Sequence, residues 1–263
     1  MNLTGRIAIV TGGSRGIGRG IAIVLAKAGA EVAFCYSKDE EGAKVTASQV
    51  EAIRGRCLSI RADVADHEKV KEMVAKTVET FGGVDILVNN AGVFGSHRYL
   101  AEEDIDRMHQ VVDSHIFGSY HCVREVLPHM HKCKRGDIYF ISSVATENFR
   151  AGNAIFTAAK AGLEAMAKCL AKEEIKNNIR VNTISPGTIE TASTLNLWRR
   201  WHDLKEMEDL YSIMPFGHTG KPEDIGNLIA FLASEEGGWI SGQVISVDGG
   251  TRGFSVPRLL TYG

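Results

Sequence analysis

A glycine-rich turn near the start of the chain has the composition of a phosphate-binding loop. It reads Thr11-Gly12-Gly13-Ser14-Arg15-Gly16-Ile17-Gly18, in the spacing Gly-x-x-x-Gly-x-Gly. Glycine lets the backbone turn tightly and approach a pyrophosphate, which then lies at the positive end of the following helix. An apolar run, 6–11, precedes the turn and an amphipathic stretch, 18–28, follows it. Because the turn joins a first strand to a first helix, it predicts dinucleotide binding more specifically than glycines alone would.

The end of the second expected strand indicates which dinucleotide binds. Proteins that bind NAD place a carboxylate there, on the ribose 2′-hydroxyl. Here the strand ends in Cys35-Tyr36-Ser37-Lys38, and the first acid is Asp39. A carboxylate would repel a 2′-phosphate, so its absence favours NADP(H), with Arg15, Ser37 and Lys38 meeting the phosphate. The plainer alternative, that Arg15 and Lys38 are only solvated surface charges, stays open.

The overall composition is typical of a soluble globular protein. The 263 residues carry a formal net charge of −2, which gives no electrostatic reason to expect nucleic acid or a membrane surface as a partner. No apolar run approaches the roughly 20 residues that span a bilayer, and no secretory signal precedes the first strand. The five cysteines are scattered and odd in number, as is usual for reduced thiols. We therefore expect a cytoplasmic protein that acts on a small molecule.

One short stretch contains residue types that can bind a metal, namely His129-Met130-His131-Lys132-Cys133. His129 and Cys133 are four residues apart and could share a helix face, whereas His129 and His131 could not. The spacing matches no ligand set closely, and the polar end of a helix explains it more simply. We expect no metal there.

Short apolar, β-branched runs alternate with longer amphipathic stretches along the chain. This alternation predicts right-handed βαβ units and a parallel sheet covered on both faces. No linker or repeat interrupts it, so we expect a single α/β domain over 1–263, a Rossmann-type doubly wound sheet. The expected strands are 6–11, 31–36, 56–61, 86–89, 137–142, 180–184 and 244–247, and the expected helices are 18–28, 40–53, 66–81, 102–131, 154–177 and 221–233.

The segment 191–220 interrupts the alternation. It combines the aromatic residues Trp198 and Trp201 with basic residues, namely Arg199, Arg200 and His202. It follows a strand end, where open α/β sheets bind their ligands, and long inserted segments are often active-site lids. We favour a lid over an apolar pocket with room for an anionic group. The alternative is a helical insertion that packs on the body or on another subunit.

Further motifs follow the glycine turn in a fixed order. They are Asp63-Val64, Asn89-Asn90-Ala91-Gly92, Ile141-Ser142-Ser143, Pro186-Gly187-Thr188-Ile189-Glu190-Thr191, Gly242-Gln243-Val244 and Val247-Asp248-Gly249-Gly250. With them the chain resembles the short-chain dehydrogenase/reductase family over essentially its whole length, and within it the members of the 3-oxoacyl-[acyl-carrier-protein] reductase type.

The resemblance implies a cofactor role for most of these motifs. Asp63 and Val64 would meet the adenine. The glycine turn, including Gly12, Ser14, Gly16, Ile17 and Gly18, would hold the pyrophosphate. The residues expected to line the nicotinamide half are Asn90, Ala91, Gly92, Pro186, Gly187, Ile189 and Thr191.

The catalytic positions of the family are matched only in part. In the family a Ser holds the substrate carbonyl and a Tyr supplies the proton. A Lys lowers the pKa of that Tyr and binds the nicotinamide ribose, and an Asn supports a water relay. Ser143 and Lys160 match, but the Tyr position, four residues before the Lys, is Phe156, and the Asn position is His115. Both departures concern the proton rather than the cofactor, because a phenyl ring can neither give nor take one.

Three interpretations follow from Phe156 and His115. The chain is an oxidoreductase that uses another acid, or a binding protein or non-redox enzyme built on the same pocket, or an engineered Tyr-to-Phe variant. A single engineered change would not explain His115. Losing general acid catalysis typically costs roughly 10²–10⁴-fold, which cripples hydride transfer without abolishing it. We favour an altered oxidoreductase acting on a carbonyl or secondary alcohol. His115 would be the first replacement acid, because imidazole titrates near neutrality, and Ser143, Lys160, water, His97 and Tyr99 are the other proton sources considered.

The resemblance also implies a homotetramer. In the family the late helix, here 221–233, and the last strand pack against symmetry mates, and the long helix, here 102–131, forms another interface.

Overall fold

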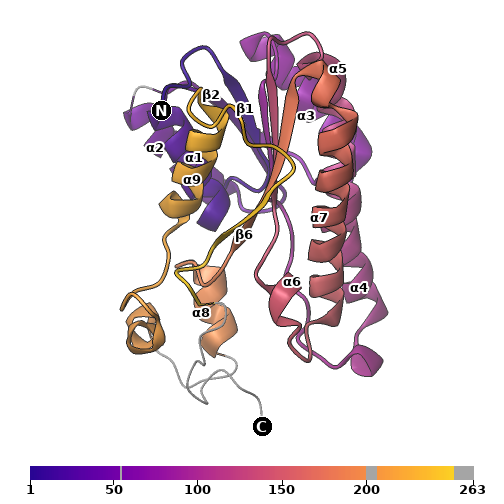
Figure 1. Ribbon diagram of the computed structural model, residues 1–263, viewed down its shortest axis with the longest axis vertical. Helices are drawn as coiled ribbons and strands as arrows, with labels where there is room; N and C mark the ends of the chain where they lie inside the picture. The colour runs from indigo at the N-terminus through magenta and orange to yellow at the C-terminus, as the bar shows by residue number, and fades with distance from the viewer. Residues whose placement is uncertain (54, 200–205, 252–263) are drawn as a thin grey trace.

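Seven parallel strands form one sheet in the order β3-β2-β1-β4-β5-β6-β7 (Figure 1). The computed structural model describes residues 1–53, 55–199 and 206–251. The strands are β1 (Ile7–Val10), β2 (Glu31–Tyr36), β3 (Cys57–Arg61), β4 (Ile86–Asn89), β5 (Gly136–Ile141), β6 (Ile179–Pro186) and β7 (Val244–Val247). The direction of strand order reverses between β1 and β4, and open α/β sheets bind their ligands at the carboxyl ends of strands at such a point. The predicted doubly wound sheet is thus confirmed.

Helices cover both faces of the sheet. They are α1 (Gly16–Lys27), α2 (Glu40–Ala52), α3 (His67–Phe81), α4 (Ile105–Val112), α5 (Gly118–Met130), α6 (Ala145–Asn148), α7 (Ala154–Glu173), α8 (Ala192–Arg199) and α9 (Pro222–Ala233). Helices α1 and α9 pack on one face, and α3, α5 and α7 on the other. No described helix is long and apolar enough to cross a membrane.

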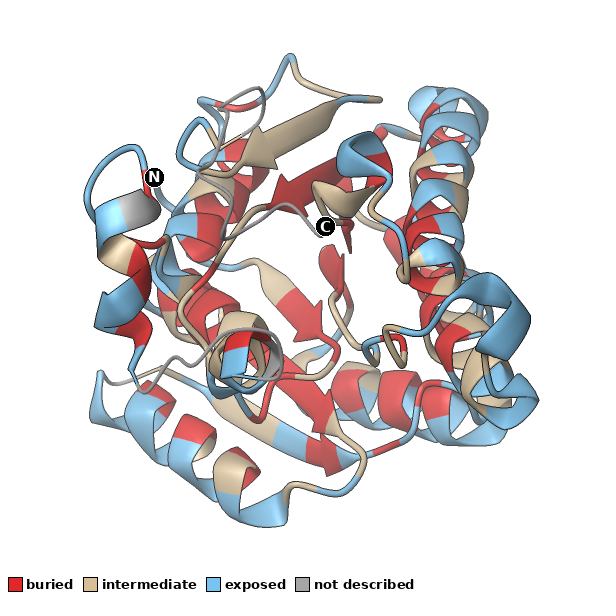
Figure 2. Cartoon of the chain, turned by 90° about the horizontal axis from the view of Figure 1, so that it is seen from below, coloured by how far each residue is buried: buried red, intermediate tan, exposed pale blue. Residues whose placement is uncertain are grey.

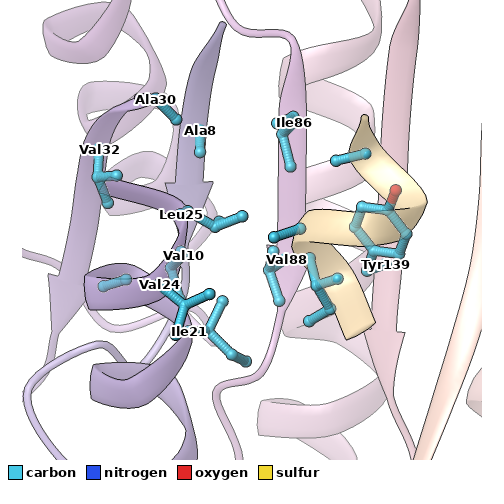
Figure 3. Close-up of a cluster of buried hydrophobic side chains, with 14 of the residues drawn as sticks. Ala8, Val10, Ile21, Val24, Leu25, Ala30, Val32, Ile86, Val88 and Tyr139 are labelled. Atoms are coloured by element: carbon cyan, nitrogen blue, oxygen red, sulfur yellow. The ribbon is translucent and has the colours of Figure 1, made fainter. Parts of the chain in front are cut away.

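The core consists of two apolar layers, one on each side of the sheet. Alternate residues of a strand point to opposite faces, so Val10 of β1 packs with α1 and its neighbour Ile9 packs with the other layer. Figure 3 shows the first layer between the sheet and Ile21, Val24 and Leu25 of α1. Strands buried on both faces read as continuous apolar runs, which is why the sequence reveals them so clearly.

The long helix expected over 102–131 differs from the prediction in two ways. It begins at Ile105, because the Asp104 carboxylate accepts a hydrogen bond from Arg107 N and caps the helix. It then continues to Met130 with a π-helical segment, η2 (Asp113–Phe117), between α4 and α5. Single π-helical turns inside α-helices are frequent at functional sites, and this one carries His115.

The helix expected over 154–177 is shorter than predicted. It ends at Glu173 and is followed by the 3₁₀ segment η3 (Ile175–Asn177) and by Asn178, which has a left-handed backbone with φ of 55°. The remaining elements lie within two residues of their expected bounds. The short helix α6, directly after β5, was not predicted.

The amino ends of β1, β5 and β6 meet at a buried ion cluster. Asp137 is fully buried, and its carboxylate lies 2.8 Å from Arg6 Nη2, 2.6 Å from Arg180 Nη2 and 3.3 Å from Arg135 Nε. The same arginines donate to the last carbonyls of α9, those of Leu232 and Ala233. The cluster therefore fixes α9 against the end of the sheet opposite the predicted site.

The segment 191–220 contains α8 and the 3₁₀ segment η4 (Met207–Ile213), at the lower end of the molecule in Figure 1. Trp198, Met207 and Leu210 are buried against one another and against Leu195. Arg200, Trp201 and His202 lie outside the described residues. The segment thus has a small apolar cluster of its own, separate from the two main layers.

Candidate active site

The glycine turn has a backbone that other residues would not adopt. Gly12 and Gly16 have φ of 67° and 53°, in the left-handed region that favours glycine. Gly18 lies so close to the turn that an added Cβ would come within 2.2 Å of Gly12 O and 2.5 Å of the Asn90 side chain. The turn therefore lies between the start of α1 and the end of β4, at the point where the strand order reverses.

Hydrogen bonds hold the turn to the end of β4. Thr11 Oγ1 accepts from Asn90 N and Ala91 N, both at 2.9 Å, and Asn90 Nδ2 donates to Thr11 O at 2.8 Å. Gly92, next in the chain after Ala91, packs against His115, because an added Cβ on Gly92 would come 1.9 Å from a ring carbon of His115. The glycine turn, the Asn-Asn-Ala-Gly motif and His115 thus pack against one another in sequence.

The first turn of α1 is left open for an anion. Its N-cap, Arg15, makes no side-chain capping bond, and the first amides of a helix have no acceptor within the helix. Arg19, which the sequence did not single out, supports the loop from inside by donating to Ser14 O and Gly42 O and to Thr46 Oγ1. Free amides at the positive end of a helix dipole make a phosphate site.

The end of β2 carries no carboxylate that is free to bind a ribose. The Asp39 carboxylate accepts from Gly42 N and caps α2, whereas Arg15 and Lys38 are exposed. The Ser37 hydroxyl donates to Asp63 Oδ2 at 2.9 Å, so binding of a 2′-phosphate at Ser37 requires Asp63 to turn away. The neighbouring Val64 is fixed through its carbonyl, which lies 3.1 Å from His121 Nδ1, a second residue that the sequence analysis missed.

The turn predicted to meet the nicotinamide lies against the glycine turn. An added Cβ on Gly16 would contact the Thr191 side chain at 3.3 Å, which places the two turns side by side. Gly187 packs so tightly on Asp248 that a Cβ would come within 2.7 Å of it. Beside this turn a cavity of about 250 Å³ is lined by Thr188 and Ile189 from the turn and by Met214, Phe216 and His218 from the segment 191–220, among other residues.

The predicted catalytic residues come together at the ends of β5 and α7. Lys160 is buried, and its Nζ donates to Ile141 O at 2.6 Å. Burial lowers the pKa of Lys160 to about 7, although Glu164 opposes the shift. The Lys160 Nζ lies 5.5 Å from the centre of the Phe156 ring, and Ser143 lies two residues beyond the end of β5. Figure 2 views the molecule from this end of the sheet.

Phe156 lies in an aromatic cluster. Its ring stacks on Phe94 at 5.6 Å between ring centres and meets His115 edge-on at the same distance. Phe156 is 8% exposed and Phe94 39% exposed. Two of the other residues considered as proton sources, His97 and Tyr99, lie in the loop after Gly92, where Tyr99 is 64% exposed. Phe94 was not predicted, and its only signal was its position two residues after the Asn-Asn-Ala-Gly motif.

His115 does not have the properties of a cationic acid. Its Nε2 lies 2.9 Å from Val93 O, and a carbonyl only accepts, so this nitrogen carries the proton and Nδ1 has none. Burial, followed by the nearby charge of Lys160, lowers the pKa of His115 to about 3. At neutral pH the imidazole is therefore neutral, and its N–H is committed to the backbone. His115 is therefore a poor candidate for the replacement acid, contrary to the expectation from the sequence.

We expect this depressed pKa to make folding stability depend on pH. The unfolded imidazole takes up a proton below about pH 6.5, whereas the folded one resists until about 3, so stability is lost as pH falls. Replacing His115→Asn should remove about 2 kcal/mol of the stability difference between about pH 7 and pH 5. Urea unfolding at both pH values measures this. If the free energy of unfolding fell equally between about pH 7 and pH 5 in the original protein and in His115→Asn, the pKa of His115 would not be depressed by folding.

A carboxylate that the sequence analysis missed braces the strand end that carries Ser143. Glu164 Oε1 accepts from Ser142 Oγ at 2.6 Å and lies 2.8 Å from Thr146 Oγ1. The residues that flank Ser143 are thus tied to α7, one helical turn beyond Lys160. The sequence shows only that Glu164 lies four residues after Lys160. That Glu164 faces β5 is visible only in the folded chain.

Comparison with known proteins shows clear relatives. Residues 12–252 match a family model described as enoyl-(acyl carrier protein) reductase. The chain is 35% identical over 252 residues to the 3-oxoacyl-[acyl-carrier-protein] reductase of Thermotoga maritima, covering 95% of this chain and 99% of that one. It is 34% identical to an uncharacterized oxidoreductase of Methylorubrum extorquens, with the same coverage.

Solved structures give the same result. A short-chain dehydrogenase from Burkholderia cenocepacia, in complex with NADP, superimposes with a TM-score of 0.85 at 34% identity, covering 95% of this chain and 99% of that chain. A short-chain dehydrogenase/reductase from Serratia marcescens superimposes with a TM-score of 0.86, at the same identity and coverage.

Proposed function

Because the chain belongs to the short-chain dehydrogenase/reductase family, we propose that it is an NADP(H)-dependent oxidoreductase acting on a carbonyl or a secondary alcohol, with a proton path that lacks the usual Tyr. The observation that carries the proposal is the joining of an open helix terminus, the two cofactor turns and Lys160 at one end of the sheet. The bound cofactor would supply or accept the hydride.

Within this proposal, each residue of the site has a separate role. The glycine turn and the start of α1 bind the pyrophosphate, and Arg15 and Lys38 meet the 2′-phosphate. Lys160 fixes the nicotinamide ribose, and Ser143 holds the substrate oxygen. Phe156 fills the place of the proton donor, and His115 supports the wall behind it as a neutral imidazole.

The segment 191–220 would act as the lid, with the cavity beside Thr188 as part of the pocket that it closes. We further propose the homotetramer and the cytoplasmic location expected of the family. The exposed side chains of Phe231 in α9 and of Trp239, which follows α9, support the homotetramer, because they are large apolar groups that a symmetry mate would cover.

A second function, NADP(H) binding without redox turnover, is favoured by one observation. The two titratable side chains beside Phe156, those of His115 and Lys160, each direct an N–H at a backbone carbonyl. A protein that only senses or carries the cofactor would need no acid.

Titration of NADPH and NADH by fluorescence tests the cofactor, and oxidation of NADPH with a panel of ketones and acyl thioesters tests the reaction. The oxidoreductase is expected to prefer NADPH and to turn over slowly on at least one of them, and Lys160→Ala should lose both properties. Tight binding without turnover, in the natural protein and also after Phe156→Tyr, would establish the second function instead.

We also expect Glu164 to set the pH range of cofactor binding. Its negative charge raises the pKa of Lys160 against the effect of burial, so Glu164→Gln should lower that pKa further below about 7. NADPH binding that depends on the ammonium should then weaken roughly threefold to tenfold at about pH 8, and less at about pH 6.

The matched control for Glu164 is Ser142→Ala, which removes a hydrogen bond to the same carboxylate but keeps its charge. It should reduce turnover by loosening Ser143 and leave the pH dependence of NADPH binding where it was. A purely structural role for Glu164 would give the two variants the same pH profile.

A further inference from the structure

The site is better suited to a hydride transfer that needs no proton than to the reduction of a ketone. When a ketone takes a hydride at carbon, its oxygen becomes an alkoxide that must gain a proton. Among the described residues at this position, Phe156 has no proton to give, and the N–H of His115 is bonded to Val93 O. Ser143 can hold the oxygen, but its hydroxyl needs a donor behind it to pass on a proton. The remaining candidate, Lys160, donates to Ile141 O and lies 5.5 Å from the centre of the phenyl ring, which cannot relay a proton from it.

Without a donor, charge would separate inside a buried site. The reduced ketone would be an alkoxide beside the cationic nicotinamide, and Phe156 and Phe94 would offer the alkoxide an aromatic wall in place of a hydrogen bond. An unpaired charge in an apolar environment is strongly disfavoured.

A substrate that is already a cation avoids this difficulty. In an iminium ion the hydride from C4 of the reduced nicotinamide forms the new C–H bond, and the π pair of the C=N bond becomes the lone pair of the amine. The reaction R₂C=NR₂⁺ + NADPH → R₂CH–NR₂ + NADP⁺ is balanced without any proton. One positive charge passes from substrate to cofactor, so no ion pair has to be created in the site.

The walls of the site fit such a substrate. Phe94 stacks on Phe156 with an interplanar angle of 25° and remains 39% exposed, so the aromatic pair is reachable from solvent. Aromatic faces attract cations and stack on planar rings. Lys160 Nζ already lies over the Phe156 ring, 5.5 Å from its centre, so this aromatic face already accommodates an amino group that can carry positive charge.

We propose that the natural substrate class of this site is a planar cyclic iminium ion, which is reduced to a tertiary or secondary amine. This proposal rests on the proposed function for its cofactor and its hydride transfer, and it replaces the C=O bond by a C=N⁺ bond as the preferred hydride acceptor. It makes Phe156 a specificity-determining residue rather than a defect.

A matched pair of probes tests the substrate class. One probe is the 2-methyl-3,4-dihydroisoquinolinium ion, which is permanently charged, and the other is 1-tetralone, a neutral ketone with the same fused rings. Oxidation of NADPH is followed by absorbance, with enzyme-free mixtures as the blank. We expect kcat/KM for the iminium ion to exceed that for the ketone by roughly 10²-fold or more, because an acid typically contributes at least that much to carbonyl reduction.

The Phe156→Tyr variant and the pH profile separate the possible results. The variant should raise the ratio of ketone to iminium turnover by roughly 10²–10⁴-fold, since only the ketone uses an acid. Iminium turnover should vary little with pH, whereas ketone turnover should fall as pH rises.

Turnover of 1-tetralone without turnover of the iminium ion would overturn this inference and leave the proposed function standing, as would an equal gain for both probes in Phe156→Tyr. The proposed function itself would be overturned if NADPH bound but neither probe and no member of the carbonyl panel were turned over. This result would have to hold for the protein with Phe156 and for Phe156→Tyr.

Discussion

Replacing Phe156→Tyr is expected to raise the kcat/KM for carbonyl reduction by roughly 10²–10⁴-fold, the usual contribution of a general acid. The ring already lies with its face 5.5 Å from Lys160 Nζ, and the variant adds only a hydroxyl. In the proposed mechanism the ammonium of Lys160 would lower the pKa of that hydroxyl, and Ser143 would hold the substrate oxygen. Initial rates with NADPH and a ketone, at several pH values, measure the effect.

Two controls make this result specific. NADPH affinity should change little, because Phe156 belongs to the proton side of the site and not to the glycine turn. Phe94→Tyr places a hydroxyl on the neighbouring ring of the same stack and should give no comparable gain. If both variants raised the rate equally, the gain would reflect polarity of the pocket rather than an acid at position 156.

Replacing Asp137→Asn is expected to lower the free energy of unfolding by about 3–5 kcal/mol, the usual cost of removing one partner of a buried ion pair. The Asp137 carboxylate is fully buried and lies within 2.8 Å of both Arg6 and Arg180. Asn keeps the shape but leaves these guanidinium groups without their counter-charge in a medium that solvates them poorly. Chemical denaturation at several protein concentrations measures the loss and separates it from any effect of assembly.

The matched control is an exposed ion pair. Glu41 lies 2.7 Å from Lys44, but both side chains are largely in water, so Glu41→Gln should change the free energy of unfolding by about 0.5 kcal/mol or less. A loss below about 1 kcal/mol in Asp137→Asn would mean that water or the carbonyls of α9 solvate the arginines.

Most of the fold could be predicted because its signals are local. Strands such as β2 and β7 have the bounds expected from their apolar runs, and α9 begins at Pro222, which is well suited to a first helical turn. The π-helical turn at Asp113–Phe117 could not be predicted, because such a turn depends on packing against other elements rather than on its own residues.

The site was predictable in composition but not in function. The glycine turn and Asn90 pack together, and Lys160 is bonded to the end of β5 at the same end of the sheet. The sequence suggested that His115 could act as an acid because imidazole ordinarily titrates near neutrality. Burial and the bond to Val93 O remove that property, and neither can be seen without knowing what covers the side chain.

By itself the sequence determined the parallel sheet, the position of the glycine-containing turns and the presence of a phenyl ring at position 156, because each depends on residue type and order along the chain. Tertiary structure alone decided the protonation of His115, the pKa of Lys160 and the bonds from Ser142 and Thr146 to Glu164. These properties depend on desolvation and on contacts between residues far apart in the chain, and both are set only when the chain is folded.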